Sequence, residues 1–290
     1  MSREHIDLSA GRIGYRDVGE GPPLLFLNGL FVDGQLWRNV TPSFESDHRC
    51  VVPDLPIGSH TIPLKPDADV TFLGLARLIL EFIEKLGLDD VTIVANDTAG
   101  ALTQIAMTQP GNERIARVVL TDCDAFENCP PGPFKAFKYA ARVPPLLTAL
   151  MQPMRWRPLR RLPYWFGAKR PIDPEVEAAY VRPFFTQSEI RRDLMRFFRA
   201  LDKRYTIEAA VRLPEFDRPV LIAWATEDKV FPFEHAHKLA ALLPDARVEE
   251  IHDSHAFVPE DRPDRVVELV RGFLAEGARD GGRAAALREG

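Results

Sequence analysis

Short apolar runs alternate with amphipathic stretches along most of the chain. Runs rich in β-branched and other apolar residues, bounded by turn residues, predict buried strands. A longer stretch, 71–86, places apolar side chains at three- and four-residue spacing and so predicts an amphipathic helix. The other predicted helices are 101–109 and one that begins near Pro263. The predicted strands are 12–18, 24–27, 50–52, 91–94, 118–121, 219–224 and 247–251.

The order of these elements predicts an α/β fold. Strands that alternate with helices favour right-handed crossovers and a doubly wound, mostly parallel sheet with helices on both faces. The alternation stops at 130–205, where proline, aromatic residues and arginine are frequent and no strand pattern is convincing. We therefore expect a core formed by 1–129 and 206–276, with 130–205 as an inserted helical lid. The Gly-, Ala- and Arg-rich residues 277–290 have the composition of a flexible tail.

Composition narrows the class of protein. Of the 290 residues, 46% are hydrophobic and 27% are charged, which is typical of a globular protein with a large core. The net charge of −5 argues against nucleic acid as a main partner. The three cysteines form no metal-binding pattern, and we expect neither a metal nor a cofactor. No signal peptide and no bilayer-spanning apolar run is visible, so a cytoplasmic protein without membrane insertion is expected.

The candidate chemistry centres on the turn after the strand at 91–94. There the pattern is small-x-Asp-x-small-Gly, followed directly by a helix, and its central residue is Asp97. This arrangement is typical of a nucleophile elbow, whose usual centre is serine. A carboxylate that attacks a saturated carbon bearing a leaving group forms an alkyl ester, whereas attack on a carbonyl would give a labile anhydride. The plainer alternative is that Asp97 only caps the following helix.

Partners for such a nucleophile follow in the expected order of acid and then histidine. Asp228 lies in the loop after one predicted strand, and His255 lies in the loop after the last one. His252 is the second candidate for a base, because it sits closer to that strand. His235 and His237 are expected on the surface of a helix.

These features resemble the α/β-hydrolase superfamily, and in particular its aspartate-nucleophile branch of haloalkane dehalogenases and epoxide hydrolases. The resemblance covers residues 10–275. It is most specific at the Asp97 elbow, at Leu36-Trp-Arg-Asn39, at the Asp228 loop and at 255–263. It implies the α/β-hydrolase fold.

The resemblance also implies a role for each candidate residue. Asp97 would be the nucleophile, His255 the general base, and Asp228 the acid that orients it. Asp122 is the alternative acid, because some members of the superfamily draw theirs from that strand end. His255 would activate a water that attacks the ester on Asp97.

An oxyanion hole completes the implied mechanism. The backbone N–H groups of Thr98 and of either Leu30 or Phe31 would stabilise the developing charge.

The leaving group stays open at this point. Haloalkane dehalogenases hold the halide with a Trp directly after the nucleophile and an Asn in the oxyanion loop, where this chain has Thr98 and Leu30. Epoxide hydrolases protonate the opening ring with two lid tyrosines. Aromatic residues of a lid are more often core than catalytic. The candidate contacts to substrate or leaving group are Asn28, Trp156, Trp165, Tyr139, Tyr164 and Tyr180.

Three functions follow as hypotheses. The first is a haloalkane dehalogenase-like hydrolase that acts on a small apolar organic substrate with water. The second is epoxide hydrolysis with help from lid tyrosines. The third, of another class, is a non-catalytic protein that binds an apolar small molecule on the same fold.

The charge of the predicted lid is a separate observation. Residues 130–205 contain 16 Lys or Arg against 6 Asp or Glu. Solvated helix faces and attraction between lid and core explain this composition most simply. Recruitment of an anionic substrate or surface is the sharper alternative.

Overall fold

An eight-stranded sheet forms the centre of the molecule. The structure is a computed structural model that describes residues 3–286, without the side chains at 133, 163, 165 and 277–286. The strands are β1 (Glu4–Leu8), β2 (Gly11–Val18), β3 (Pro23–Leu27), β4 (Arg49–Pro53), β5 (Val91–Asp97), β6 (Ile115–Cys123), β7 (Val220–Ala225) and β8 (Ala246–Ile251). Their order in the sheet is β1-β2-β4-β3-β5-β6-β7-β8. Only β2 runs antiparallel to its neighbours, which confirms the mostly parallel sheet.

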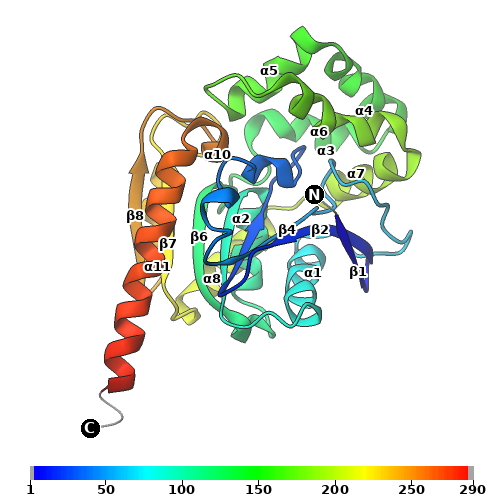
Figure 1. The fold of residues 1–290 in the computed structure, drawn as a ribbon. Coiled ribbons are helices and arrows are strands. Elements are labelled where there is room, and N and C mark those ends of the chain that lie inside the picture. Colours follow the sequence, from blue (N-terminus) through cyan, green and yellow to red (C-terminus); the bar gives the residue numbers. More distant parts are fainter. Residues whose placement is uncertain (1–2, 287–290) are drawn as a thin grey trace.

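Helices cover both faces of the sheet. The helices are α1 (Phe72–Lys85), α2 (Thr98–Ala106), α3 (Lys135–Ala140), α4 (Pro144–Met151), α5 (Arg157–Gly167), α6 (Pro174–Thr186), α7 (Ser188–Ala200), α8 (Arg204–Arg212), α9 (Glu234–Leu242), α10 (Val258–Asp261) and α11 (Pro263–Ala286). α2 packs between α1 and α8, whereas α11 packs against β7. In Figure 1, α11 lies in front of β7 and β8, and α3 to α7 gather at the end of the molecule away from the C-terminus.

The elements predicted most clearly have a local physical cause. The side chain of Thr71 accepts a hydrogen bond from the Gly74 N–H at 3.0 Å and so caps the start of α1. Gly87, with a positive φ of 62°, follows its end. Every residue of β5 is buried, because this strand lies between β3 and β6 in the middle of the sheet.

Other elements differ from the prediction. β1 was not predicted, because its sequence is largely polar and it forms an exposed edge. α11 continues to Ala286, beyond the predicted end at residue 276. Residues 287–290 of the predicted tail lie outside the described part of the chain. Between β6 and β7 the described residues form helices and no strand, in agreement with a helical insertion at 130–205.

Basic side chains connect this inserted segment to the core. On α7, Arg192 donates to the Leu64 carbonyl at 2.7 Å, and Arg196 donates to the Lys65 carbonyl at 3.2 Å. Asp193, fully buried between them, accepts from the Leu64 N–H at 2.8 Å. These bonds favour the simpler explanation of the segment's positive charge, which is attachment to the core.

The close packing of Gly100 in α2 against Cys123 in β6 can be tested by mutation. A methyl group on Gly100 would lie 2.3 Å from Cys123 Cβ, so we expect Gly100→Ala to destabilise the protein by about 1–3 kcal/mol through overpacking. Gly272→Ala is the control, because nothing lies within 4 Å of that position in α11 and alanine favours a helix by about 1 kcal/mol. Urea unfolding measures both variants. Equal stability of Gly100→Ala and wild type would contradict the packing described here.

Candidate active site

Asp97 stands at the end of β5, where the chain turns sharply into α2. Its backbone has φ 59° and ψ −134°, a conformation that L-residues adopt rarely and that functional sites often hold under strain. A Cβ on Gly29 would lie 2.3 Å from Asp97 Cβ, and a Cβ on Gly100 would meet Cys123 equally closely. The close contact at Gly100 therefore explains the glycine of the elbow pattern, and the close contact at Gly29 explains the glycine of the loop after β3.

Two backbone N–H groups converge on one oxygen of Asp97. Leu30 donates to Asp97 Oδ1 at 3.1 Å, and Thr98 donates to the same oxygen. The Phe31 N–H instead donates to the Ile57 carbonyl at 3.3 Å. Of the two alternatives for the loop donor, the geometry thus favours Leu30. Burial raises the pKa of Asp97, and the hydrogen bonds from Thr98 and Leu30 oppose that rise.

Both candidate acids lie together at the next strand ends. Asp122, fully buried at the end of β6, accepts from the Ala225 N–H at 2.9 Å. Asp228, partly buried after β7, accepts from the Val230 N–H at 2.7 Å. Burial raises the pKa of each carboxyl group, and the charge of Asp228 raises that of Asp122 further. The two neighbouring groups therefore titrate as a pair.

His255 lies buried in the loop after β8, next to the elbow. The Asn96 side chain, directly before Asp97, donates to the Ala256 carbonyl at 2.7 Å and so holds the histidine loop against the end of β5. The backbone N–H of His255 donates to Asp261 Oδ2 at 3.0 Å. Asp97, Asp228 and His255 are thus brought to one edge of the sheet by the loops that follow β5, β7 and β8.

Asp261 also connects the histidine loop to the inserted segment. Its carboxylate accepts from the backbone N–H groups of Lys169 at 2.8 Å and Arg170 at 2.7 Å. Nearby, the Phe257 N–H donates to the Gly167 carbonyl at the end of α5. Sequence reasoning missed both Asn96 and Asp261, because the first occupies an unspecified position of the elbow pattern and the contacts of the second are made with residues distant in sequence.

The other candidate histidines lie elsewhere. The side chain of His252 is 71% exposed and lies beside Glu250, so it is not part of the buried site. His235 is buried on α9 with its ring 5.4 Å from that of Phe126. The expectation of a surface position was therefore wrong for His235, because the β6–α3 connection covers that side of α9.

A small closed cavity lies directly over Asp97. Its volume is about 10 Å³, on the order of the space that one water requires. Asp97, Thr98 and Asp124 supply its polar groups. The surrounding apolar wall comes largely from Phe134, Phe197, Leu201 and Phe231. The first three of these belong to the inserted segment, which therefore covers Asp97.

Asn28 and Tyr164 were predicted to contact the substrate, and the structure places both elsewhere. Asn28 donates to the Val32 carbonyl at 2.6 Å, which uses its amide to shape the loop. Tyr164 donates to the Phe31 carbonyl at 2.9 Å. Neither residue lines the cavity at Asp97.

The remaining lid candidates also lie away from Asp97. Tyr180 donates to Glu260 at 3.4 Å, so its hydroxyl faces α10. Tyr139 and Trp156 are 63% and 66% exposed. Trp165 is in α5, and its side chain lies outside the described part of the structure. None of the described lid tyrosines or tryptophans therefore reaches the nucleophile.

Asp124 is a site residue that the sequence analysis did not single out. It is 3% exposed, and its Oδ2 accepts from the Thr98 hydroxyl at 3.2 Å. Its Oδ1 has no hydrogen-bond partner among the described residues. Gln104 donates to its backbone carbonyl at 2.9 Å and fixes its position. The sequence could have singled out Asp124 as a second carboxylate, two residues after Asp122, at the end of a predicted strand.

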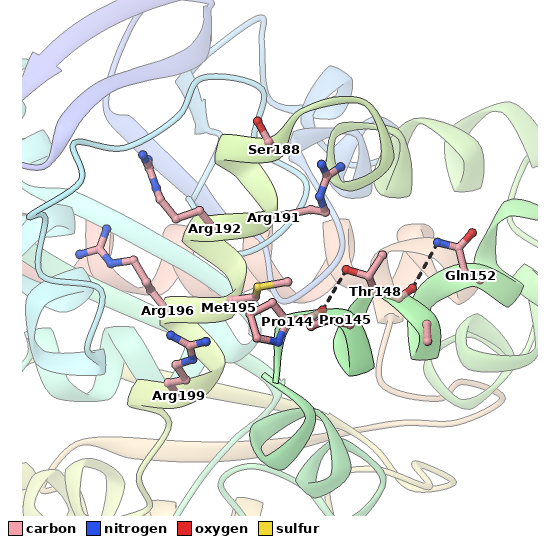
Figure 2. Close-up of a pocket in the computed structure, with 11 residues that line it drawn as sticks. Pro144, Pro145, Thr148, Gln152, Ser188, Arg191, Arg192, Met195, Arg196 and Arg199 are labelled. Atoms are coloured by element: carbon pink, nitrogen blue, oxygen red, sulfur yellow. Dashed lines mark hydrogen bonds between the residues drawn. The ribbon is translucent and has the colours of Figure 1, made fainter. Parts of the chain in front are cut away.

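A larger hollow lies on the surface of the inserted segment. This groove of about 690 Å³ runs between α4 and α7 and is lined by Arg191, Arg192, Arg196 and Arg199 (Figure 2). The arginines already bond to main-chain carbonyls or to Asp193. None of the predicted catalytic residues lines the groove, so the closed cavity at Asp97 is the candidate active site.

The described residues form neither a membrane-spanning helix nor a metal-binding cluster. No helix there is long and apolar enough to cross a membrane. The same part of the chain holds no group of three or more His, Cys, Asp or Glu suited to a metal ion.

The fold and the elbow define a class of protein. A nucleophile candidate on a strained strand-to-helix turn, in the middle of a mostly parallel sheet, is the arrangement of an α/β hydrolase. A family model described as "alpha/beta hydrolase fold" matches residues 22–263. The chain belongs to this family, and the predicted fold is confirmed.

Known proteins resemble the chain over nearly its whole length. It is 26% identical over 288 residues to cis-3-alkyl-4-alkyloxetan-2-one decarboxylase of Shewanella oneidensis, covering 95% of this chain and 89% of that protein. It is 28% identical over 273 residues to haloalkane dehalogenase 2 of Mycobacterium tuberculosis, covering 91% and 92%. A solved α/β hydrolase fold protein from Burkholderia ambifaria superposes with a TM-score of 0.79 at 22% identity, over 92% of this chain and 96% of that one.

The raised pKa of Asp228 predicts a pH-dependent stability. Its folded pKa is about 7 against a reference of 3.8, so its stabilising contribution is complete below pH 3.8 and is lost as pH rises through 7. Relative to Asp228→Asn, which does not titrate, wild type should lose up to about 1.4 kcal/mol per pH unit in this window. Urea unfolding at a series of pH values measures the difference. Parallel curves for the two proteins would contradict the assignment.

Proposed function

We propose that the protein is a hydrolase that acts at saturated carbon through an alkyl ester on Asp97, as a haloalkane dehalogenase-like enzyme. The observation that carries this proposal is the carboxylate at the elbow, held by two backbone N–H groups on one oxygen. A serine at this place would suit acyl transfer, whereas a carboxylate suits displacement at an alkyl carbon.

The two oxygens of Asp97 have different roles in this mechanism. Because Oδ1 accepts from Leu30 and Thr98, Oδ2 is the oxygen available for attack. After attack, Oδ1 becomes the carbonyl oxygen of the ester. When water adds to that ester, negative charge develops on Oδ1, where both N–H donors already point. The resting hydrogen bonds thus prepare the second step.

His255 and Asp228 act in that second step. His255 removes a proton from the water that attacks the ester, and the charge of Asp228 stabilises the imidazolium that results. The backbone N–H of Val230 holds the carboxylate of Asp228 in place. The inserted segment 130–205 acts as a lid, because its side chains close the cavity over the nucleophile.

The relatives support displacement at an alkyl carbon. A haloalkane carries its halogen on a saturated carbon, and an oxetan-2-one carries its ring oxygen on one. Proteins with these two substrate names resemble the chain over at least nine-tenths of its length. The apolar wall of the cavity suits a small apolar substrate with water as the second reactant.

The trapping of an ester on Asp97 tests the proposal. In a His255→Gln variant the first step stays intact and the second loses its base, so the alkyl enzyme accumulates. The variant is incubated with 1-iodohexane and with 1,2-epoxyhexane and then analysed by intact-protein mass spectrometry and peptide mapping. We expect a mass increase that maps to Asp97.

The control is Asp97→Asn in the same background, which should stay unlabelled. If neither compound labels Asp97, the proposed reaction is wrong. Equal retention of an apolar ligand by Asp97→Asn and wild type would then favour the non-catalytic binding protein.

A further inference from the structure

Two carboxyl groups line the same closed cavity of about 10 Å³. Asp97 and Asp124 are 8% and 3% exposed, and Thr98 stands between them in the hydrogen-bond network. No Lys or Arg is among the residues that line the cavity. Two carboxylates that share one dry space do not both ionise at moderate cost, so one of them keeps a proton.

The hydrogen bonds decide which group keeps it. Asp97 accepts from two backbone N–H groups and stands at the N-terminus of α2, which both favour its charged form. Asp124 accepts from a single hydroxyl, and burial followed by the charge of Asp97 raises its pKa well above the usual range. Its Oδ2 is occupied by Thr98, so the proton resides on the unpartnered Oδ1 in the cavity wall.

We propose that Asp124 is a catalytic acid that protonates an oxygen leaving group, and that the substrate is a strained cyclic ether opened at a saturated ring carbon. This inference rests on the proposed attack by Asp97. A halide departs as a stable anion and needs no proton, whereas an alkoxide is a poor leaving group until it is protonated.

The reaction requires only one proton on the two carboxyl groups, and that proton starts on Asp124. Asp97 Oδ2 forms a bond to the ring carbon, the carbon–oxygen bond of the ring breaks with its electron pair on oxygen, and Asp124 transfers its proton to that oxygen. His255 then takes a proton from water as it adds to the ester, and returns it to the departing alcohol oxygen. Asp97 is left protonated and gives that proton to Asp124, which restores the resting state.

The position of Asp124 also matters because the described lid tyrosines supply no proton donor at the nucleophile. The described lid tyrosines bond elsewhere or lie exposed, so they do not supply a proton at the nucleophile. Thr98, directly after the nucleophile, bonds to Asp124, and both line the cavity. Asp124 is therefore the described carboxyl group that lines the cavity together with the nucleophile.

Other titratable groups lie near Asp124. Cys123 and Cys129 are buried, and the charge of Asp124 contributes to the raised pKa of each thiol, while Lys138 opposes that rise at Cys129. On the neighbouring strand ends, burial raises the pKa of Asp122 and of Asp228. Because all these groups are present in the reactions with both an oxygen and a halide leaving group, the difference between the two pH responses reports Asp124.

Leaving-group dependence tests the proposal. Asp124→Asn is made in the His255→Gln background, and the rates of Asp97 labelling by 1,2-epoxyhexane and 1-iodohexane are compared. We expect labelling by the epoxide to fall by about 100-fold or more, since general acid catalysis contributes on that order. Labelling by the iodide should change by less than a few fold. Asp33→Asn, at another buried carboxyl with a raised pKa, is the matched control and should alter neither rate.

A pH series on the His255→Gln protein gives a second readout that needs no change at Asp124. Labelling by the epoxide should fall at high pH, as Asp124 loses its proton, while labelling by the iodide should not.

Three results would overturn the role of Asp124. They are equal loss of both labelling rates in Asp124→Asn, equal pH dependence for both compounds, and labelling by the iodide alone. In each of these cases Asp97 is still alkylated and the proposed function stands. Labelling by neither compound removes the proposed function and the inference together.

Discussion

The central constraint on this molecule is the burial of several carboxyl groups at one edge of the sheet. Asp97, Asp122 and Asp124 are buried at the ends of β5 and β6, and Asp228 is partly buried after β7. Isolated buried charges are costly, so each group has to receive hydrogen bonds or keep a proton. Asp97 receives two backbone N–H bonds. Burial and the charges of neighbouring carboxyl groups raise the pKa of Asp122, Asp124 and Asp228. The chemistry that we propose depends on this distribution of protons.

The parallel sheet brings these carboxyl groups together. Because the carboxyl ends of parallel strands lie at the same edge of the sheet, loops that are distant in sequence meet there. The strained turn at Asp97 places its carboxylate against the first N–H of α2 and against the Gly29–Leu30 loop. Asp261 then fixes the His255 loop to the residues after α5, which joins the inserted segment to the base. The histidine loop is thereby attached to the inserted segment.

Much of this arrangement could be predicted from the sequence, because its causes are local. The strands of the sheet, the stripe of α1 and the small residues around Asp97 each follow from a pattern of a few neighbouring residues. The order of Asp97, Asp228 and His255 predicted which loops meet at the edge.

What the sequence did not reveal depends on tertiary contacts. The choice of Leu30 over Phe31 depends on a positive φ at Phe31 and on its bond to Ile57. The orientation of the lid aromatics depends on how short helices pack, and two of the predicted contacts, Tyr139 and Trp156, are exposed. The role proposed for Asp124 depends on its position in the same cavity as Asp97, which the sequence alone did not predict.

The most direct test of the central claim follows the oxygen atom. Wild-type enzyme in molar excess over 1-iodohexane is allowed one turnover in ¹⁸O-water, and both the alcohol and the Asp97 peptide are analysed by mass spectrometry. If the reaction passes through an ester on Asp97, the hexanol of this first turnover carries unlabelled oxygen from Asp97, while the Asp97 peptide gains ¹⁸O. Hexanol that carries ¹⁸O from the first turnover, with an unlabelled Asp97 peptide, would show direct attack by water and would contradict the ester mechanism.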